Sequence, residues 1–110
     1  MTSIPLRYEI YLANLNPTIG GEIKKIRPVV VVSQDEMNRY LETIVICPLT
    51  TTIHPTWRCR LQVNCDGVDA EIVVDQIRAI SKQRLIRKID QLSEEQAAHL
   101  RRMITEMYGE

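Results

Sequence analysis

The stretch GGEIKKIRPVVVVS, residues 20–33, decides the fold, because a flexible start and a cluster of charges lead into a long apolar run. Its second half, residues 27–33, is rich in β-branched side chains, which predicts a central β-strand covered on both faces. Pro28 is compatible with the start of that strand, where a residue need not donate to the ladder. Gly20 and Gly21 predict a preceding loop with unusual backbone angles.

Further β-structure is predicted on the two sides of this valine run. Apolar or alternating segments that favour strands occur at residues 9–15, 43–49, 57–63, 70–81 and 84–92. The segment 57–63 predicts a half-exposed antiparallel strand, one face of which carries Trp57, Cys59, Leu61 and Val63. Residues 70–81 fit two short strands or one bent strand, and residues 84–92 fit a strand or a turn. Residues 34–41 have room for one or two helical turns.

One amphipathic helix is predicted at the end of the chain. Ser93 and Gln96 have the spacing of a capping box, and Gly109 is a residue at which the helix can stop. Apolar residues repeat at helical spacing between them: Ala97, Leu100, Met103, Ile104 and Met107. We expect this helix to pack on the sheet or on a partner. Short strands with a single terminal helix predict one domain over residues 1–110, mainly β, folded as a small, strongly bent barrel.

The composition is that of an ordinary globular chain. Lys and Arg total 14, as do Asp and Glu, so the formal net charge is zero and any nucleic acid must bind at a local patch. One Trp, four Tyr and no Phe leave few side chains that can stack on bases. The first residues lack the apolar stretch of a signal peptide, and no run reaches the length of a membrane span. We therefore expect a cytoplasmic protein with reduced thiols and no membrane partner.

The cysteines and histidines do not have the spacing of a metal site, and we expect neither a metal nor a cofactor. Cys47 and Cys59 are predicted to be small buried residues of the sheet, whereas Cys65, beside a turn, is predicted to be exposed. His54 lies in a threonine-rich loop and is a candidate ligand contact, while His99 falls on the predicted helix, near its surface. The two histidines are placed too differently to favour a paired acid–base mechanism.

Three segments are candidates for chemistry, each with a plainer alternative. Arg27, at the base of the buried strand, has a planar fork of donors that suits a phosphate. The plainer alternative is a surface arginine that pairs with Glu22. The threonines of PLTTT, residues 48–52, offer hydroxyls that can donate to an oxyanion. The plainer alternative is that they are ordinary residues at the end of a strand. Residues 76–89 carry five cations and no acid, which suits a phosphate backbone or a solvated face.

Taken in order, these segments resemble the MazF/PemK family of toxin endoribonucleases. The resemblance rests on RYEIYLANLNPTIGGEIKKIRPVVVVS, TIVICPLTT, VVDQIRAISKQRL and KIDQLSEEQ, and it spans nearly the whole chain. It implies a mainly β, SH3-like barrel of the CcdB/PemK type with a C-terminal amphipathic helix. It also implies metal-independent, sequence-specific cleavage of single-stranded mRNA by 2′-hydroxyl attack, which leaves a 2′,3′-cyclic phosphate and a 5′-hydroxyl.

The resemblance also assigns roles to residues. It implies that Arg27 and Thr50 are catalytic, with Arg27 as phosphate clamp and candidate general acid and Thr50 as oxyanion donor, and it leaves the general base open. The positions expected to bind RNA lie in the loops and the basic segment: Glu22, Lys24, Lys25, Ser33, Asn38, Thr51, His54, Asp75, Gln76, Arg78, Lys82 and Arg84. One departure is Tyr8, which stands where most relatives have glycine before the acid of the first strand.

The partners implied are single-stranded RNA, a second copy of the chain in a homodimer, and an acidic, partly disordered antitoxin through which operator DNA is bound indirectly. Two alternatives differ in function class. One is a non-enzymatic, CcdB-like inhibitor of DNA gyrase, and the other is an inactive barrel kept for binding an antitoxin or an operator.

Overall fold

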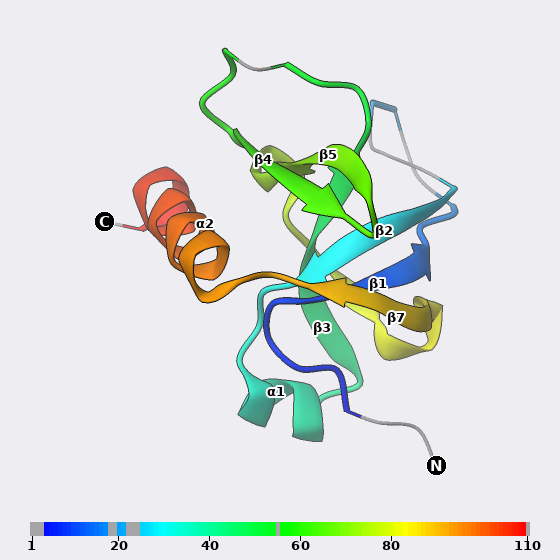
Figure 1. Cartoon of the computed structure of the whole chain (residues 1–110). Coiled ribbons are helices and arrows are strands. Elements are labelled where there is room, and N and C mark those ends of the chain that lie inside the picture. Colours follow the sequence, from blue (N-terminus) through cyan, green and yellow to red (C-terminus); the bar gives the residue numbers. More distant parts are fainter. Residues whose placement is uncertain (1–3, 18–19, 22–24, 55, 110) are drawn as a thin grey trace.

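An antiparallel sheet that curls on itself forms the body of the protein, with one long helix against its side (Figure 1). The computed structural model describes residues 4–17, 20–21, 25–54 and 56–109. Its elements in chain order are β1 (Glu9–Asn14), β2 (Ile26–Val31), α1 (Asp35–Tyr40), β3 (Thr43–Thr50), β4 (Arg60–Cys65), β5 (Val68–Val73), η1 (Val74–Gln76), β6 (Arg78–Ser81), η2 (Lys82–Arg84), β7 (Leu85–Gln91) and α2 (Glu94–Tyr108), where η marks a short 3₁₀-helix.

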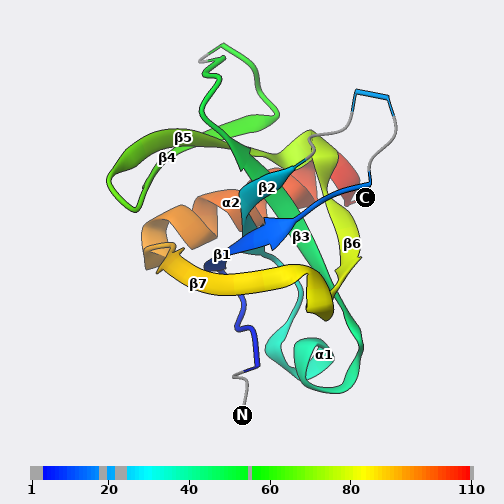
Figure 2. The ribbon, with the colours of Figure 1, turned by 90° about the vertical axis from the view of Figure 1, so that its right-hand side faces the viewer.

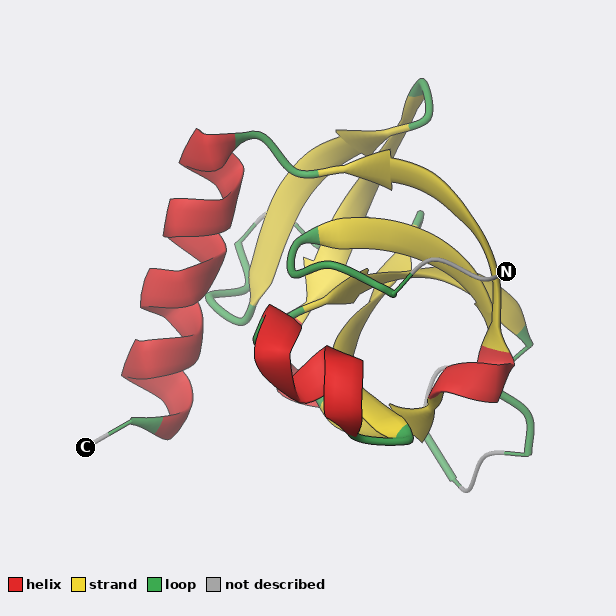
Figure 3. Cartoon of the chain, turned by 90° about the horizontal axis from the view of Figure 1, so that it is seen from below, coloured by secondary structure: helices red, strands yellow, loops and turns green. Residues whose placement is uncertain are grey.

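The strands are ordered β4-β5-β3-β2-β1-β7, and β6 pairs with β3 off this path. Strand β3 is long enough to serve two partners on one edge, because its residues 43–46 pair with β6 and its residues 49–50 pair with β5. This division bends the sheet into a small, incompletely closed barrel (Figure 3). The predicted fold class is confirmed, and residues 70–81 form two strands separated by η1.

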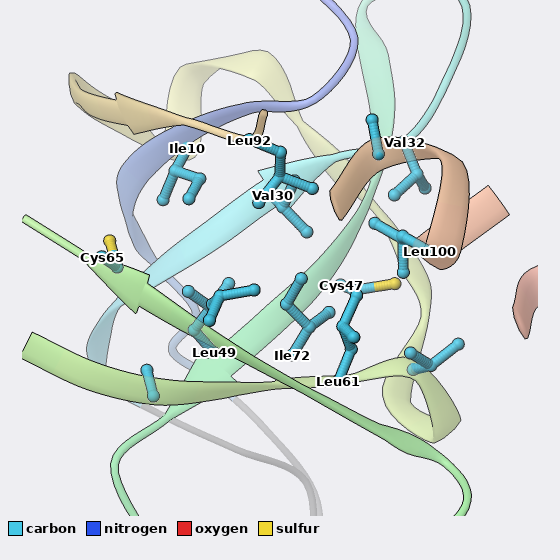
Figure 4. Close-up of a cluster of buried hydrophobic side chains, with 14 of the residues drawn as sticks. Ile10, Val30, Val32, Cys47, Leu49, Leu61, Cys65, Ile72, Leu92 and Leu100 are labelled. Atoms are coloured by element: carbon cyan, nitrogen blue, oxygen red, sulfur yellow. The ribbon is translucent and has the colours of Figure 1, made fainter. Parts of the chain in front are cut away.

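Strand β2 is covered on both faces, as its run of valines predicts. Val30 belongs to a cluster that includes Cys47, Leu49 and Leu100 (Figure 4), whereas Val29 and Val31 belong to a second cluster on the other face of the sheet. Both clusters are buried, and the three valines have no exposed surface. The position of β2 is therefore fixed from two sides, which makes its end a rigid place from which to present a side chain.

Helix α2 packs along one side of the barrel through the face that its sequence predicts (Figure 2). The predicted capping box is present, since Ser93 Oγ accepts from the Gln96 N–H and Gln96 Oε1 accepts from the Ser93 N–H. Leu100 and Met103 are buried against the chain's own core, while Met107 remains 37% exposed. The apolar face of α2 is therefore mostly used within the chain and is not left for a partner.

The segment before β4 differs from the sequence prediction. Strand β4 begins at Arg60, and before it the Trp57 N–H donates to the His54 carbonyl at 3.0 Å. Trp57 is 47% exposed rather than on the core face of a strand. The alternation that holds over residues 60–65 was extended three residues too far toward the N-terminus, across a turn that side-chain stacking stabilises.

The cysteines also differ in part from the prediction. Cys65 was expected to be exposed but is only 5% exposed, because it is the last residue of β4 and shares the core face of Leu61 and Val63. Cys59 is half-buried rather than in the core, and Cys47 is buried as expected. Burial, together with Asp75, raises the pKa of Cys47 to about 12, and burial likewise raises the pKa of Cys65. Neither thiol is a nucleophile at neutral pH.

Tyr8 occupies a backbone conformation that suits glycine. Its φ is 71°, in the left-handed region. Its N–H donates to the Val31 carbonyl at 2.6 Å, and its carbonyl accepts from the Leu92 N–H at 2.9 Å. The conformation thus joins the end of β2 to the segment before α2, which explains why glycine fits the equivalent position of the family pattern.

We expect Tyr8→Gly to be more stable than Tyr8→Ala by about 1 kcal/mol. Both variants lose the ring over which the Arg7 guanidinium lies at 4.9 Å, but only alanine retains the left-handed strain. Chemical denaturation of the two variants measures the difference in their free energies of unfolding. Equal midpoints with equal slopes would show that φ at this position carries no penalty.

Candidate active site

Arg27 and Thr50 lie on neighbouring strands and on one face of the sheet. Strands β2 and β3 are antiparallel, with Val29 opposite Pro48. The ladder ends at that pair, and its register continued by two residues along each strand would set Arg27 opposite Thr50, since both residues still belong to their strands. Side chains at opposed positions of an antiparallel pair point to the same face, with Cβ atoms about 5 Å apart. The register therefore predicts that the two residues lie close together.

The Thr50 hydroxyl is oriented by its own loop. Oγ1 accepts a hydrogen bond of 3.2 Å from the Thr52 N–H, in the bend that follows β3. A hydroxyl that accepts in this way retains its own proton as a donor. Thr50 is half-buried and so is Arg27, so each side chain is held by the sheet and reachable from solvent. The pair offers a guanidinium fork and an oriented hydroxyl to one ligand.

Two loops and η1 surround this pair. The described parts of the β1–β2 connection and the β3–β4 loop rise from the same end of the barrel in two perpendicular views (Figures 1 and 2). Gln76 of η1 contacts the first of these connections, because its Nε2 donates to the Gly21 carbonyl at 3.5 Å. Arg78 pairs with Ile46 and lies on the same face of the sheet as Arg27, with its Nη1 atom buried. Gln76 therefore contacts the β1–β2 connection, whereas Arg78 lies opposite Ile46, about 13 Å along β3 from Thr50.

A buried carboxylate holds the base of the β3–β4 loop. Glu71, opposite Thr50 in the β3–β5 pair, has no exposed surface. One of its oxygens accepts from the His54 N–H at 2.9 Å, and the other lies 3.3 Å from Arg60 Nη1. Asp75 lies 3.5 Å from Arg60 Nε and raises the pKa of Cys59 after the larger effect of desolvation. Asp75 therefore supports the loop through Arg60, beside the predicted site.

Lys25 and Arg84 lie at the base of the β1–β2 connection. The Lys25 N–H donates to Asn16 Oδ1 at 3.0 Å, and Lys25 is exposed two residues before Arg27. Arg84 Nη1 donates to the carbonyls of Asn14 and Asn16, so this cation fastens the connection to the barrel. Thr51 is exposed directly after Thr50. Glu22 and Lys24, which the prediction also named, lie outside the described residues.

Three predicted contacts lie at the other end of the barrel. Ser33 and Asn38 are buried and bonded to each other, and Asn38 Nδ2 donates to the carbonyls of Pro5 and Ser33. Lys82 lies beside Ser81, which pairs with the first residue of β3, about 23 Å along that strand from Thr50. The structure does not bring these residues to Arg27, and the polar contacts of Ser33 and Asn38 anchor the N-terminal segment to α1.

The five cations of residues 76–89 do not form one continuous patch. Lys88 Nζ is paired with Glu9 at 2.8 Å, and Arg87 lies opposite Leu12 on the β1–β7 pair. Within the described ranges, no three His, Cys, Asp or Glu side chains are grouped so that they could hold a metal ion. None of the helices in those ranges is both long and apolar enough to cross a bilayer.

Sequence reasoning missed the charged group under the loop. Glu71 is the one acid in the apolar run AEIVV, and Arg60 stands between Cys59 and Leu61. An ionisable residue inside a buried strand requires a partner of opposite charge, so the presence of Glu71 and of Arg60 in such strands indicates that they pair. Their positions in paired strands could be assigned only once the β4–β5 register was known.

Comparison with known proteins identifies the family of the chain. Residues 6–108 match the family described as PemK-like, MazF-like toxin of type II toxin–antitoxin system. The chain is 35% identical over 95 residues to Endoribonuclease EndoA of Bacillus subtilis, which covers 81% of each chain. It is 34% identical over 96 residues to Endoribonuclease MazF of Staphylococcus saprophyticus, covering 80% of this chain and 78% of that protein.

Solved structures share the fold at lower sequence identity. A crystal structure of MazF from Deinococcus radiodurans matches with a TM-score of 0.87 at 19% identity, covering 99% of this chain and 100% of the other. An endoribonuclease in complex with its cognate antitoxin from Mycobacterial species matches with a TM-score of 0.79 at 20% identity, covering 96% and 95%. From the family match over nearly its whole length, this chain belongs to the PemK-like, MazF-like toxins of type II toxin–antitoxin systems.

Proposed function

We propose that this toxin, an endoribonuclease, cleaves single-stranded RNA at a phosphate bound between Arg27 and Thr50, without a metal ion. The observation that supports this most directly is the β2–β3 register, which, continued two residues past the Val29–Pro48 pair, would set the two residues opposite each other on one face. A guanidinium and a hydroxyl in this relation suit a phosphodiester, because the first binds oxygens as a fork and the second donates to a single oxygen.

The reaction is an attack of the 2′-hydroxyl oxygen on the adjacent phosphorus. A bond forms between O2′ and phosphorus, and the bond between phosphorus and the 5′ oxygen of the next nucleotide breaks. The 2′ proton passes to a base, and the leaving 5′ oxygen takes up a proton. The products are a 2′,3′-cyclic phosphate and a 5′-hydroxyl end, and no other reactant is consumed.

Arg27 and Thr50 act on the charge that develops at phosphorus. The Arg27 guanidinium binds the non-bridging oxygens through its planar, positively charged fork of N–H donors. The Thr50 hydroxyl donates to one of these oxygens, and its bond from the Thr52 N–H fixes its direction before the substrate arrives. Lys25, Thr51, Gln76 and Arg78 surround the pair and contact the flanking nucleotides.

Replacement of Thr50 tests this function. With EDTA present, we expect Thr50→Val to cleave single-stranded RNA about 10²- to 10³-fold more slowly than the parent, because it removes one donor to the transition state. Thr50→Ser retains the hydroxyl and should stay within about tenfold of the parent. Gel analysis of the cut RNA, with enzymatic removal of the cyclic phosphate, identifies the ends. Undiminished cutting by Thr50→Val, or loss of cutting in EDTA, would contradict the proposal.

A gyrase inhibitor of the CcdB type is the alternative function, and the family match over residues 6–108 favours the nuclease instead. Several structural neighbours are complexes of MazF with MazE, and we infer an antitoxin partner for this chain as well. Binding of operator DNA through that antitoxin, and a homodimer, remain part of the proposal. Leu100 and Met103 of α2 pack within the chain while Met107 and Tyr108 stay exposed, and sedimentation at micromolar concentration measures whether a dimer forms.

A further inference from the structure

The only tryptophan of the chain is held rigidly in the loop that follows Thr50. The His54 and Trp57 rings are stacked, with centroids 3.8 Å apart and an angle of 5° between their planes. The Arg60 guanidinium lies over the Trp57 ring, 4.7 Å from its centroid. We call these three side chains the aromatic stack. Trp57 nevertheless keeps 47% of its surface exposed.

The aromatic stack is built on buried charge. Glu71, which has no exposed surface, accepts from the His54 N–H and pairs with Arg60, while Asp75 contacts Arg60 from η1. Each of the stacked groups is thereby fixed to the sheet, through the same acid that lies opposite Thr50. A large aromatic surface that is exposed and rigid is suited to binding, because little conformational freedom is lost when a ligand covers it.

We propose that the aromatic stack binds one unpaired nucleobase of the RNA substrate, close to the scissile phosphate. Flat, parallel rings match the face of a base, and a stacked base needs no specific hydrogen bond. The exposed Arg58 beside Trp57 adds positive charge for the neighbouring phosphates. His54 follows Thr50 by four residues, at most about 14 Å of extended chain, so a short stretch of single-stranded RNA spans both.

This inference rests on the proposed RNA cleavage and adds a positioning role for Trp57. A base held on the aromatic stack fixes where the strand lies and thus which phosphate reaches Arg27 and Thr50. Loss of the stack should therefore weaken substrate binding more than it slows the chemical step, so KM rises while kcat changes little. Few aromatic residues are present in the chain, and the stack contains the only tryptophan, which is 47% exposed.

The test uses the fluorescence of the single tryptophan. The probe is an RNA oligonucleotide that spans a cleavage site mapped with this protein, with a 2′-deoxynucleotide at that site so that the strand stays intact. A matched series carries one abasic nucleotide at each successive position. We expect the intact strand to quench Trp57, and one abasic position near the uncut phosphate to remove the quenching and weaken binding about tenfold. Equal quenching of Trp57 by the intact strand and by every abasic strand would overturn the inference.

Variants give a second, independent measurement. Trp57→Ala should bind the intact probe about tenfold more weakly and should no longer distinguish it from the abasic probe at the critical position. Trp57→Phe retains a ring and should recover most of the affinity. Tyr40→Ala, which removes an aromatic residue that is 75% exposed on α1 at the other end of the barrel, is the matched control and should bind as the parent does. Unchanged affinity of Trp57→Ala would contradict the role.

The failure of this inference can be told from failure of the proposed function. If the parent cleaves RNA normally but its fluorescence does not depend on the bases, base binding by the aromatic stack is contradicted and the proposed nuclease function is kept. If the protein does not cut RNA, oligouridine and its abasic analogue serve as probes. Quenching of Trp57 by oligouridine but not by the abasic analogue would then support base binding by the aromatic stack and contradict the proposed nuclease function. Quenching by a glutamate-rich peptide but not by any RNA would assign the surface to a protein partner and overturn the inference.

Discussion

Arg27→Ala is expected to lower kcat/KM for RNA cleavage by about 10³-fold, the largest functional effect that the site predicts. Arg27 lies at the start of β2, where the continued β2–β3 register would face it to Thr50, and it carries the positive charge of the proposed pair. Removing it leaves the hydroxyl alone to stabilise a phosphorus centre that gains negative charge in the transition state. Single-turnover cleavage of a labelled RNA, with protein in excess, measures this loss at the chemical step.

Two further variants separate charge from geometry. Arg27→Lys retains a point charge but lacks the planar fork, and it should recover only part of the rate, remaining about tenfold or more below the parent. Arg102→Ala removes an exposed cation from α2 and should cleave at the parental rate. Thermal unfolding of each variant checks that the fold persists. Cleavage by Arg27→Ala within tenfold of the parent would remove Arg27 from the mechanism.

Arg60→Ala should cause the largest loss of stability, about 3 to 5 kcal/mol in the free energy of unfolding. The Arg60 side chain is 10% exposed and the Glu71 side chain is fully buried, so the truncation leaves a carboxylate in the interior without its cation. Asp75 loses the same partner. The loss is a large part of the stability of a domain of this size, and urea denaturation measures it directly.

The matched control for this prediction is Arg58→Ala, because Arg58 is an exposed arginine two residues away and should change stability by no more than about 0.5 kcal/mol. The cause can be isolated with a second change. Glu71→Gln placed in the Arg60→Ala background removes the stranded charge and keeps an oxygen for the His54 N–H, so the double variant should be more stable than Arg60→Ala alone. Equal instability of the two would show that lost packing, not charge, is responsible.

Much of the framework could be predicted because it depends on local patterns. The valines of β2 pack alternately into two buried clusters, one on each face of the sheet, as expected for a strand covered on both faces. Helix α2 begins after Ser93, where the capping box with Gln96 predicts it. The facing of Arg27 and Thr50 required more than a pattern. It depends on the β2–β3 register, which one sequence does not reveal, and only the resemblance to a family linked the two residues beforehand.

The errors arose where contacts between distant residues overrule local alternation. Trp57 was assigned to a strand because it continues the period of Leu61 and Val63, but stacking on His54 and the anchor at Glu71 hold it in a turn instead. Ser33 and Asn38 are expected from the sequence to contact RNA, whereas the Asn38 amide donates to the Pro5 carbonyl and the Ser33 hydroxyl accepts from the Val45 N–H. Polar residue types alone do not distinguish a binding surface from an internal support.

The way the β3–β4 loop is tethered has a consequence for how such toxins diversify. Residues 50–54 are anchored at both ends, because Thr50 belongs to β3 and the His54 N–H donates to Glu71. The residues between them, Thr51, Thr52 and Ile53, are exposed. If Thr50 binds the scissile phosphate as proposed, substitutions at these three exposed positions would change the surface that the RNA meets beside it and leave both anchors in place. Target preference could then change without any change at Arg27 or Thr50.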